Sequence, residues 1–428
     1  MPPTARTTTP VRHTLLAASL AAILCAASPG ASAQAPAEAA PAALTTPSLK
    51  DLFEAAWSRQ PEAQALQRRH DAMRAQRRAA EAWTPDPPAF EASHETDRLT
   101  RNGGARALEI GMTVPLWLPG ERAASAALAD AEAAALQSRV DAARMRLAAS
   151  LREAWWNWLS TGVDAETARG QLDSARRIAA DVARRTRAGD LARADQHQAD
   201  GAVASAEAAA AQAETALSVA LQQIKALSGT TPNVRPAVDA ATEREPMTAQ
   251  ATAHPALAEW QDRFPVAERA VALARTQSRA NPELTLTTTR DRGAAGERYG
   301  QTVTLAVRIP FGGGPRHDSR VASAQADALE AQAQLELDRL RLQSESTAAQ
   351  ARVDAARLQR AAAERRAALG RETRGFFEKS FRLGETDLPT RLRIEAEATE
   401  AERQAARSHI ELAAAISAWR QVLGLLPS

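Results

Sequence analysis

The chain has 428 residues, of which 53 are Lys or Arg and 51 are Asp or Glu, so its formal net charge at pH 7 is +2. This balance excludes the strong positive charge of typical nucleic-acid-binding proteins, and we expect no nucleic-acid partner. Only 4% of the residues are aromatic, and the alanine-rich, charged composition favours long helices or coiled coils over a large aromatic core.

Residues 1–33 have the pattern of a secretory signal peptide. A basic start precedes an apolar run that is too short to span a bilayer, and small residues at 31–33 form the cleavage site. The bulky Leu24 before Cys25 argues against lipid attachment at that cysteine. Residues 34–47, rich in Ala and Pro, are predicted to form a disordered leader.

The next segment, residues 48–82, is predicted to be helical. Ser48 is a suitable N-cap, and the acidic Asp51 follows in the first turn. Pro61 is expected to start a second helical segment, because proline in a helix interior removes a hydrogen bond and clashes with the preceding turn.

Two strands are predicted over residues 88–97 and 107–115, joined by a glycine-containing loop. In the second strand every other residue is apolar, the set being Leu108, Ile110, Met112 and Val114. This alternation indicates a strand with one apolar and one polar face. Transmembrane barrels use strands of about nine to eleven residues with this pattern, and a soluble hairpin packed on a core is the alternative.

A helical hairpin is predicted over residues 120–228. Its first helix extends to Arg187, or ~100 Å at about 1.5 Å per residue. Apolar and small residues recur along it at spacings of three and four, at Leu136, Val140, Ala143, Leu147, Leu151, Ala154 and Trp158. This spacing is typical of a coiled-coil seam. The chain reverses at the sequence RAGDLARAD, and we expect the shorter returning helix to lie end to end with the helices of 48–82 alongside the long one.

The chain contains an internal duplication. Pro61 and Pro255 are 194 positions apart, and Gly189 and Gly384 are 195 positions apart. Self-similarity at a fixed offset indicates two copies of one structural unit. We place the copies at residues 48–232 and 246–428, joined by a polar linker at 233–245.

The second copy repeats the predicted elements of the first. Strands are expected at residues 282–291 and 302–310, followed by a helical hairpin at 315–424 that reverses at the sequence RLGETDLPT. Three aromatic residues at or near strand ends are candidates for a membrane-interface belt, namely Trp117, Tyr299 and Phe311. Four strands cannot close a transmembrane barrel, and an open edge cannot face lipid, so several chains must combine.

These features resemble the TolC-type outer membrane efflux proteins over residues 48–428. The resemblance rests on the duplication, on the strand-to-helix junctions VPLWLPGERAA and IPFGGGPRHDS, and on the two helical turns. It implies a mainly α fold with a small β part. Three copies would share a twelve-stranded β-barrel in the outer membrane of a Gram-negative bacterium and an α-helical barrel in the periplasm.

The resemblance also implies partners and a working end. The partners are a periplasmic membrane-fusion adaptor, an inner-membrane RND-type pump or ABC exporter, and outer-membrane lipid. The adaptor would dock on the two helical turns, at Arg187, Gly189, Asp190, Leu191, Asp195, Arg382, Gly384, Glu385 and Leu388. The second copy has Thr390 where the first has Asp195, which puts the equivalence of the two turns in question.

The function implied is a passive exit duct that requires no catalytic residue and no cofactor. The histidines of the mature chain are scattered without metal-ligand pairing, and the GGGP at 312–315 lacks the Lys and Ser or Thr of a phosphate loop. The compact size and the short chain after Gly424 favour divalent heavy-metal cations as substrate. Drug or solvent efflux and type I secretion are the alternatives.

Two other protein classes predict different sequences. A periplasmic adaptor would have one helical hairpin and glycine-rich β-domains, whereas this sequence indicates two hairpins. A soluble coiled-coil scaffold would have neither a signal peptide nor alternating strands.

Overall fold

The computed structural model describes residues 48–232, 235, 238–247, 254–312 and 314–428. The predicted signal peptide and leader, and part of the predicted linker, lie outside these residues. The first repeat contains α1 (Leu49–Arg59), α2 (Pro61–Glu81), β1 (Ala89–Thr96), β2 (Arg106–Pro115), α3 (Glu121–Ala188) and α4 (Arg193–Ser228). A short helix, α5 (Val238–Ala241), precedes the second repeat, which contains α6 (Pro255–Thr276), β3 (Glu283–Arg292), β4 (Gly300–Arg308), α7 (Gly314–Arg382) and α8 (Leu388–Val422).

The helix starts follow from local capping chemistry. The Ser48 hydroxyl accepts a hydrogen bond from the Asp51 amide at 3.2 Å, and the Asp51 carboxylate accepts one from the Ser48 amide at 2.9 Å. Both bonds satisfy amides that a helix start leaves unpaired. Pro61 occupies the first turn of α2, as predicted, because a proline there sacrifices no helical hydrogen bond.

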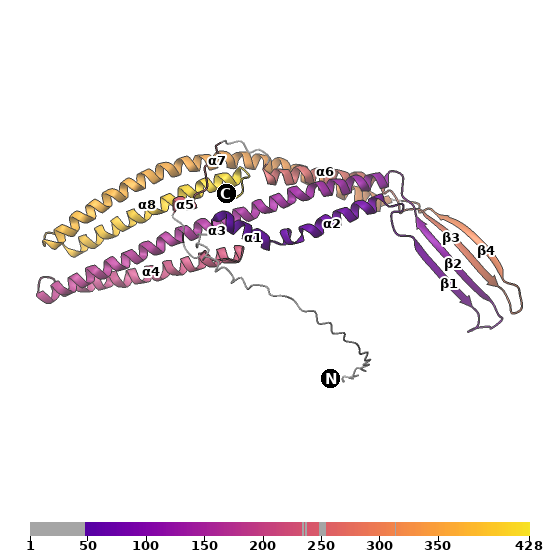
Figure 1. Ribbon diagram of the computed structural model, residues 1–428, viewed down its shortest axis with the longest axis horizontal. Helices are drawn as coiled ribbons and strands as arrows, with labels where there is room; N and C mark the ends of the chain where they lie inside the picture. Colours follow the sequence, from indigo (N-terminus) through magenta and orange to yellow (C-terminus); the bar gives the residue numbers. More distant parts are fainter. Residues whose placement is uncertain (1–47, 233–234, 236–237, 248–253, 313) are drawn as a thin grey trace, which may run out of the picture. The chain divides into compact units, whose positions relative to one another are not determined.

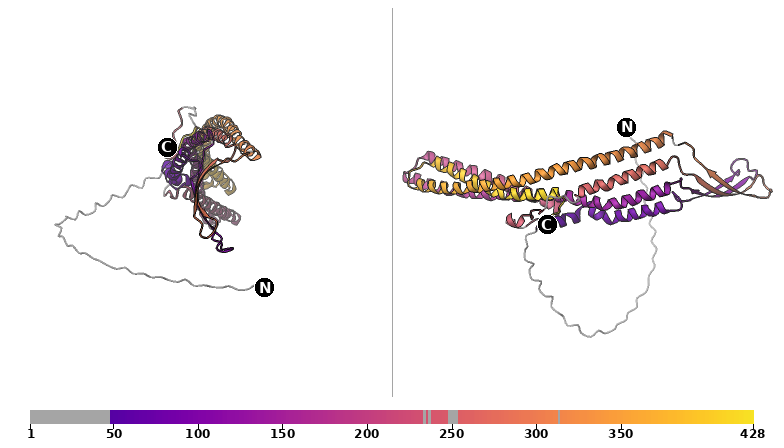
Figure 2. Two further views of the ribbon diagram at one scale, coloured as in Figure 1. Left: turned by 90° about the vertical axis from the view of Figure 1, so that its right-hand side faces the viewer. Right: turned by 90° about the horizontal axis from the view of Figure 1, so that it is seen from above.

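The helices lie side by side as one layer (Figures 1 and 2). Toward the helical turns, the order of neighbours is α4, α3, α8, α7, and toward the sheet it is α2, α3, α6, α7. The 68-residue α3 is therefore central over its whole length, whereas α7 forms one edge of the layer. The predicted end-to-end arrangement of shorter helices is confirmed, since α4 follows one half of α3 and α1 and α2 follow the other.

The main hydrophobic core lies where the two repeats meet at mid-length of α3. Phe53 of α1, Trp155 and Trp158 of α3, Ile224 of α4 and Ile410 of α8 are all buried in it. The two tryptophan rings are tilted against each other with centroids 5.2 Å apart. All seven members of the predicted seam are buried, so the coiled-coil spacing correctly identified the packed face of α3.

The four strands form one antiparallel sheet in the order β1-β2-β3-β4 (Figure 1). The central β2–β3 pair joins the two repeats. One row of paired residues on the sheet runs through Phe90, Met112, Leu286 and Leu305, and all four side chains are exposed. The opposite face carries polar rows, such as Thr113 against Thr285 with hydroxyl oxygens 3.1 Å apart. The predicted division into apolar and polar faces is confirmed.

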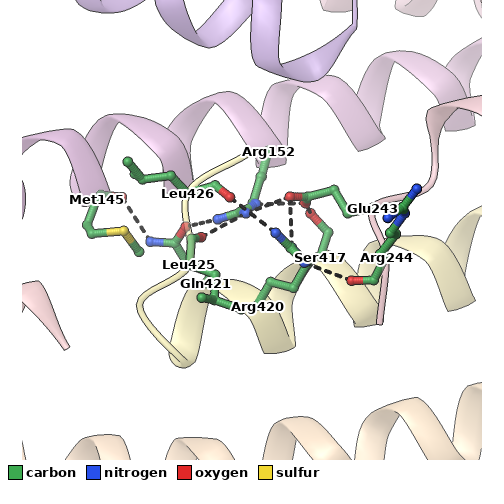
Figure 3. A network of polar contacts seen from close by, with 9 residues as sticks. All are labelled: Met145, Arg152, Glu243, Arg244, Ser417, Arg420, Gln421, Leu425 and Leu426. Atoms are coloured by element: carbon green, nitrogen blue, oxygen red, sulfur yellow. Dashed lines mark hydrogen bonds and ion pairs between the residues drawn. The ribbon is translucent and has the colours of Figure 1, made fainter. Parts of the chain in front are cut away.

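The described part of the linker differs from a simple polar connection. Ala241 packs into the main core, and Glu243 is buried. Figure 3 shows that Glu243 lies in a network of polar contacts with Arg152 of α3 and Arg420 of α8. None of the described helices has a stretch that is long and apolar enough to cross a membrane.

Candidate functional site

The turn between α3 and α4 closes with a glycine in the left-handed region. Gly189 has φ 88°, its amide donates to the Thr186 carbonyl at 3.2 Å, and the Asp190 amide donates to the Arg185 carbonyl at 2.9 Å. This hydrogen-bond pattern is a Schellman motif, which satisfies carbonyls that the helix end leaves unpaired. An alanine here would be strained because its Cβ disfavours positive φ.

The turn between α7 and α8 has the same geometry. Gly384 has φ 79°, its amide donates to the Phe381 carbonyl at 3.2 Å, and the Glu385 amide donates to the Ser380 carbonyl at 3.0 Å. The recurrence of glycine followed by an acidic residue therefore encodes one backbone motif used twice.

Asp195 of the first turn corresponds to Thr390 of the second, but each turn still has one acidic side chain that caps the returning helix. In the first turn the Asp195 carboxylate accepts a hydrogen bond from the Ala192 amide at 3.0 Å. In the second turn Asp387, which corresponds to Ala192, accepts one from the Thr390 amide at 3.2 Å. Hydrogen bonds from Thr390 lower the pKa of Asp387. The acid has moved by three residues, and it still caps the start of the returning helix.

The predicted docking residues fall into three classes of exposure. Six are exposed, namely Arg187, Gly189, Asp190, Arg382, Gly384 and Glu385. Leu191 and Asp195 are half-buried. Leu388 is only 1% exposed, so its side chain lies in the interior of the turn. The docking role of all nine residues stays a prediction.

A small core that contains Leu388 joins the two turns. It includes Ile178 and Val182 of α3 and Phe381 of α7, which come from different repeats. The Phe381 ring lies between two guanidinium groups, with the carbon of Arg185 5.0 Å and that of Arg391 4.7 Å from its centroid. Sequence reasoning missed Phe381, although an aromatic residue one turn before Gly384 is a usable signal.

Arg185 strengthens this connection between the repeats. Its side chain donates to the Phe381 carbonyl at 3.1 Å and pairs with Asp181 at 3.3 Å. The contact therefore combines apolar burial, cation–π attraction and a charged hydrogen bond. It holds the α3–α4 hairpin against the α7–α8 hairpin at their turns.

Between this small core and the main core, the two hairpins are separated by a polar groove. The groove has a volume of 690 Å³ and is lined by side chains of α3, α7 and α8, among them Arg177, Arg374 and Glu378. Polar contacts cross it: the Ser174 hydroxyl donates to the Glu395 carboxylate at 2.7 Å, and Asp164 of α3 pairs with Arg403 and Arg407 of α8. The hairpins are thus joined by polar side chains here, whereas apolar cores join them at either end.

The predicted interface aromatics lie at the ends of the sheet. Trp117 is half-buried, and its indole nitrogen donates to the Ala82 carbonyl at the end of α2 at 3.1 Å. Tyr299 is exposed between strands, and the Arg290 guanidinium carbon lies 4.7 Å from its ring centroid. Phe311 is 87% exposed, and Trp83, which sequence reasoning did not select, is 93% exposed. Their membrane contact stays a prediction.

The acidic and histidine side chains are dispersed over the helices and strands. Among the described residues, no three His, Cys, Asp or Glu side chains lie close enough together to hold a metal ion. The nearest approach to a catalytic pair is His409 against Glu364 at 2.7 Å, with both side chains on the helix surface.

Comparison with known proteins identifies the repeat. Residues 52–230 match the sequence profile described as "Outer membrane efflux protein". This first repeat is therefore similar to the outer membrane efflux protein family. The second repeat has the same order of long helices and strands. No curated protein matches the chain.

Most of the chain shares its fold with solved structures. CusC superimposes with a TM-score of 0.72 at 15% identity, covering 92% of this chain and 99% of that one. The CmeC outer membrane channel of Campylobacter jejuni has a TM-score of 0.69 at 14% identity, covering 89% and 86%. The open state of the Neisseria gonorrhoeae MtrE outer membrane channel superimposes with a TM-score of 0.69 at 15% identity, and the match covers 89% of each chain. All three are described as channels, not as enzymes.

Proposed function

We propose that the protein is the outer-membrane exit duct of a tripartite efflux system. The observation that carries this proposal is the exposed apolar face of the sheet, which continues into helices that end in exposed turns. A monomeric soluble protein rarely exposes such a continuous apolar patch, whereas a strand face against lipid requires it. The match of the first repeat to the efflux protein family supports the same function.

The duct requires other copies, because the edges of the sheet and of the helix layer are open. Within the described residues, neither β1 nor β4 has a second strand partner. Edge strands in lipid would leave backbone groups unpaired. We infer that β4 of one copy pairs with β1 of the next, and that three copies close a twelve-stranded barrel, as the resemblance to the TolC-type proteins implies.

The two edges of the helix layer are complementary in shape. On α7, large apolar residues line up at spacings of 11, 18, 11 and 7 positions and are 62% to 75% exposed; these are Leu329, Leu340, Leu358, Leu369 and Phe376. All these spacings are close to whole helical turns, so the residues form one stripe. In the half toward the turns, where Leu358, Leu369 and Phe376 lie, α4 forms the opposite edge and exposes small residues at spacings of four and three, at Ala204, Ala208, Ala211 and Thr215. Large side chains of one copy can pack against small ones of the next.

The proposed docking of an adaptor at the turns has a direct genetic test. Gly189→Pro combined with Gly384→Pro removes an amide donor and imposes a negative φ where both glycines have positive φ. We expect lost efflux with the protein still in the outer membrane. A matched Gly296→Pro change alters another positive-φ glycine in the loop between β3 and β4. Normal efflux in the double variant would reject a role of the turns.

For the substrate we propose divalent heavy-metal cations. The polar face of the sheet carries Glu91, Glu95, Glu109 and Asp291, and its Arg308 is paired with Glu283 at 3.5 Å. A lumen with this excess of negative charge attracts cations. Deletion of the gene should lower tolerance to zinc, cobalt or cadmium. Unchanged metal tolerance with lost drug tolerance would instead assign the duct to drug or solvent efflux.

A further inference from the structure

The apolar face of the sheet ends in arginines at the end farthest from the helices (Figure 1). Arg106 of β2 lies on this face, because it is an even number of positions from Met112 and side chains alternate between the faces of a strand. It is paired in register with Arg292 of β3, and Arg290 lies on the same face, two positions nearer the helices. We call Arg106, Arg290 and Arg292 the arginine cluster.

The acidic side chains around the cluster are directed elsewhere. Asp291 stands between two of the arginines in sequence, so its side chain lies on the opposite, polar face of the sheet. Glu297 of the following loop accepts hydrogen bonds from the amides of Gly293 and Ala294, both at 3.0 Å. Among the described residues, the ion pair of the sheet is that of Arg308 with Glu283 on the polar face. The arginine cluster therefore has no carboxylate partner in the described part of the chain.

The two loops at this end of the sheet hold one another in place beside the cluster. The Ala295 amide donates to the Gly103 carbonyl at 2.9 Å, and the Arg292 Nε donates to the Gly104 carbonyl at 3.0 Å. Gly104 has φ 91°, and a Cβ there would lie 2.5 Å from the Ala295 amide nitrogen. Only glycine permits this approach. The loop contact thus fixes one guanidinium group by its Nε and leaves its terminal nitrogens facing outward.

Tyr299 brings two of the guanidinium groups together. The guanidinium carbon of Arg290 lies 4.7 Å from the ring centroid, and that of Arg292 lies 5.0 Å from it. Arg106 faces Arg292 directly across the strands, and like charges in directly opposite positions are destabilising. Arg106 and Arg290 are exposed and Arg292 is half-buried. An anion bound by the cluster would remove this repulsion.

The depth of the cluster on the sheet fits a membrane surface. Residues 106–114 of β2 are nine positions long, and a tilted strand of about nine to eleven residues crosses the hydrocarbon of a bilayer. With the apolar face against lipid, the cluster therefore lies at the level of the headgroups, in the leaflet away from the helices. At the helix end, Leu116 and Ile309 are 38% and 42% exposed. The positive charge thus marks one leaflet.

We propose that the arginine cluster binds the phosphate groups of an anionic lipid in the leaflet away from the helices. Guanidinium groups match phosphate oxygens in a bidentate geometry, and three of them suit a headgroup with more than one phosphate. The acyl chains then lie on the adjoining apolar face, at Leu108 and Ile110. Free phosphate would lack this apolar contact.

The site lies at the junction of the two repeats and is present once in each chain. It is formed by the central strands β2 and β3, whereas the edge strands carry Thr96 and Gln301 at the corresponding positions. This inference rests on the proposed duct function, because it requires the sheet to lie in a membrane. It adds the chemical class of a lipid partner and the residues that select it.

The test is native mass spectrometry of the purified full-length assembly titrated with diphosphorylated lipid A. We expect one tightly bound lipid per chain. Arg106→Gln combined with Arg290→Gln should weaken binding about thirtyfold, at about fivefold for each arginine near a headgroup. Arg292 is left unchanged because it holds the loop at Gly104. The same spectra report whether each variant still assembles.

Arg101→Gln combined with Arg298→Gln is the matched control, because it removes the same charge from exposed loop positions outside the cluster. This variant should bind lipid A as the unmodified protein does. Unchanged binding in the cluster variant, or an equal loss in both variants, would overturn the proposal. Displacement of the lipid by inorganic phosphate at the same concentration would also overturn it, because the site would then be one for free anions.

The duct itself is tested separately by the conductance of the unmodified protein in a planar bilayer. A conducting assembly with no preference for lipid A would reject the lipid site alone. A soluble monomer without conductance would reject the duct.

Discussion

Phe381 provides a quantitative test of how the two turns are held together. The side chain is 2% exposed, and its ring lies between Arg185 and Arg391. Truncation of a buried phenylalanine to alanine costs about 3–5 kcal/mol. We take the lower value, about 3 kcal/mol, because the small core can partly collapse around the change. At about 1.4 kcal/mol per factor of ten, local opening should become about a hundredfold more frequent.

Amide hydrogen exchange measures this opening directly, because local unfolding exposes protected amides. The amides of Asp190 and Glu385 report on it, since each donates to a carbonyl of the helix before its turn. We expect Phe381→Ala to accelerate exchange at both, although Asp190 belongs to the other repeat. Leu383→Ala is the control, because Leu383 is 74% exposed and its loss should change little. Unchanged exchange at Asp190 would refute the idea that Phe381 couples the repeats.

Three further outcomes are expected. Asp195→Ala should destabilise the start of α4 by about 1 kcal/mol, and adding Ala192→Asp should restore its stability. Hydrogen exchange of the first-turn amides of α4 measures both effects. If Ala192→Asp fails to restore protection, the two acidic positions are not equivalent as helix caps. Burial raises the pKa of Glu243, but hydrogen bonds and charge from Arg152 outweigh burial and leave the pKa below its ordinary value of 4.5. The ionised carboxylate therefore stabilises the fold at neutral pH, and this stabilisation is lost as the pH falls below 4.5 through the lower pKa of the folded state. In this pH range the thermal midpoint of the unmodified protein should fall more steeply than that of Glu243→Gln. Parallel plots of thermal midpoint against pH would contradict this. Leu369→Glu should dissociate the assembly, as measured by light scattering, whereas Arg371→Glu, on the other side of α7, should leave it intact. An intact Leu369→Glu assembly would show that the apolar stripe on α7 does not form the contact between copies.

Much of the fold was predictable because its signals are local and repeated. Alternation at Leu108, Ile110 and Met112 assigned faces to the sheet, and the spacing from Leu136 to Trp158 assigned the buried face of α3. Glycines 189 and 384 marked the turns because left-handed backbone strongly favours glycine. Each of these features depends on residues close together in the sequence.

The features that escaped prediction depend on contacts between distant residues. Arg152, Glu243 and Arg420 lie in three separate segments, and each taken alone resembles one more charged residue on a helical surface or in a polar linker. The burial of Leu388 also had no periodic signal, because its partners Ile178 and Val182 come from the other repeat. The sequence pattern identified the turns but not the packing that joins them.

The central claim is that copies of this chain form a membrane-spanning duct. The most direct measurement is the single-channel conductance of the purified, detergent-extracted assembly in a planar lipid bilayer, with its mass measured in parallel. We expect stepwise conductance from an assembly of three chains recovered from the outer-membrane fraction. A monomer in the soluble fraction that produces no conductance would contradict it.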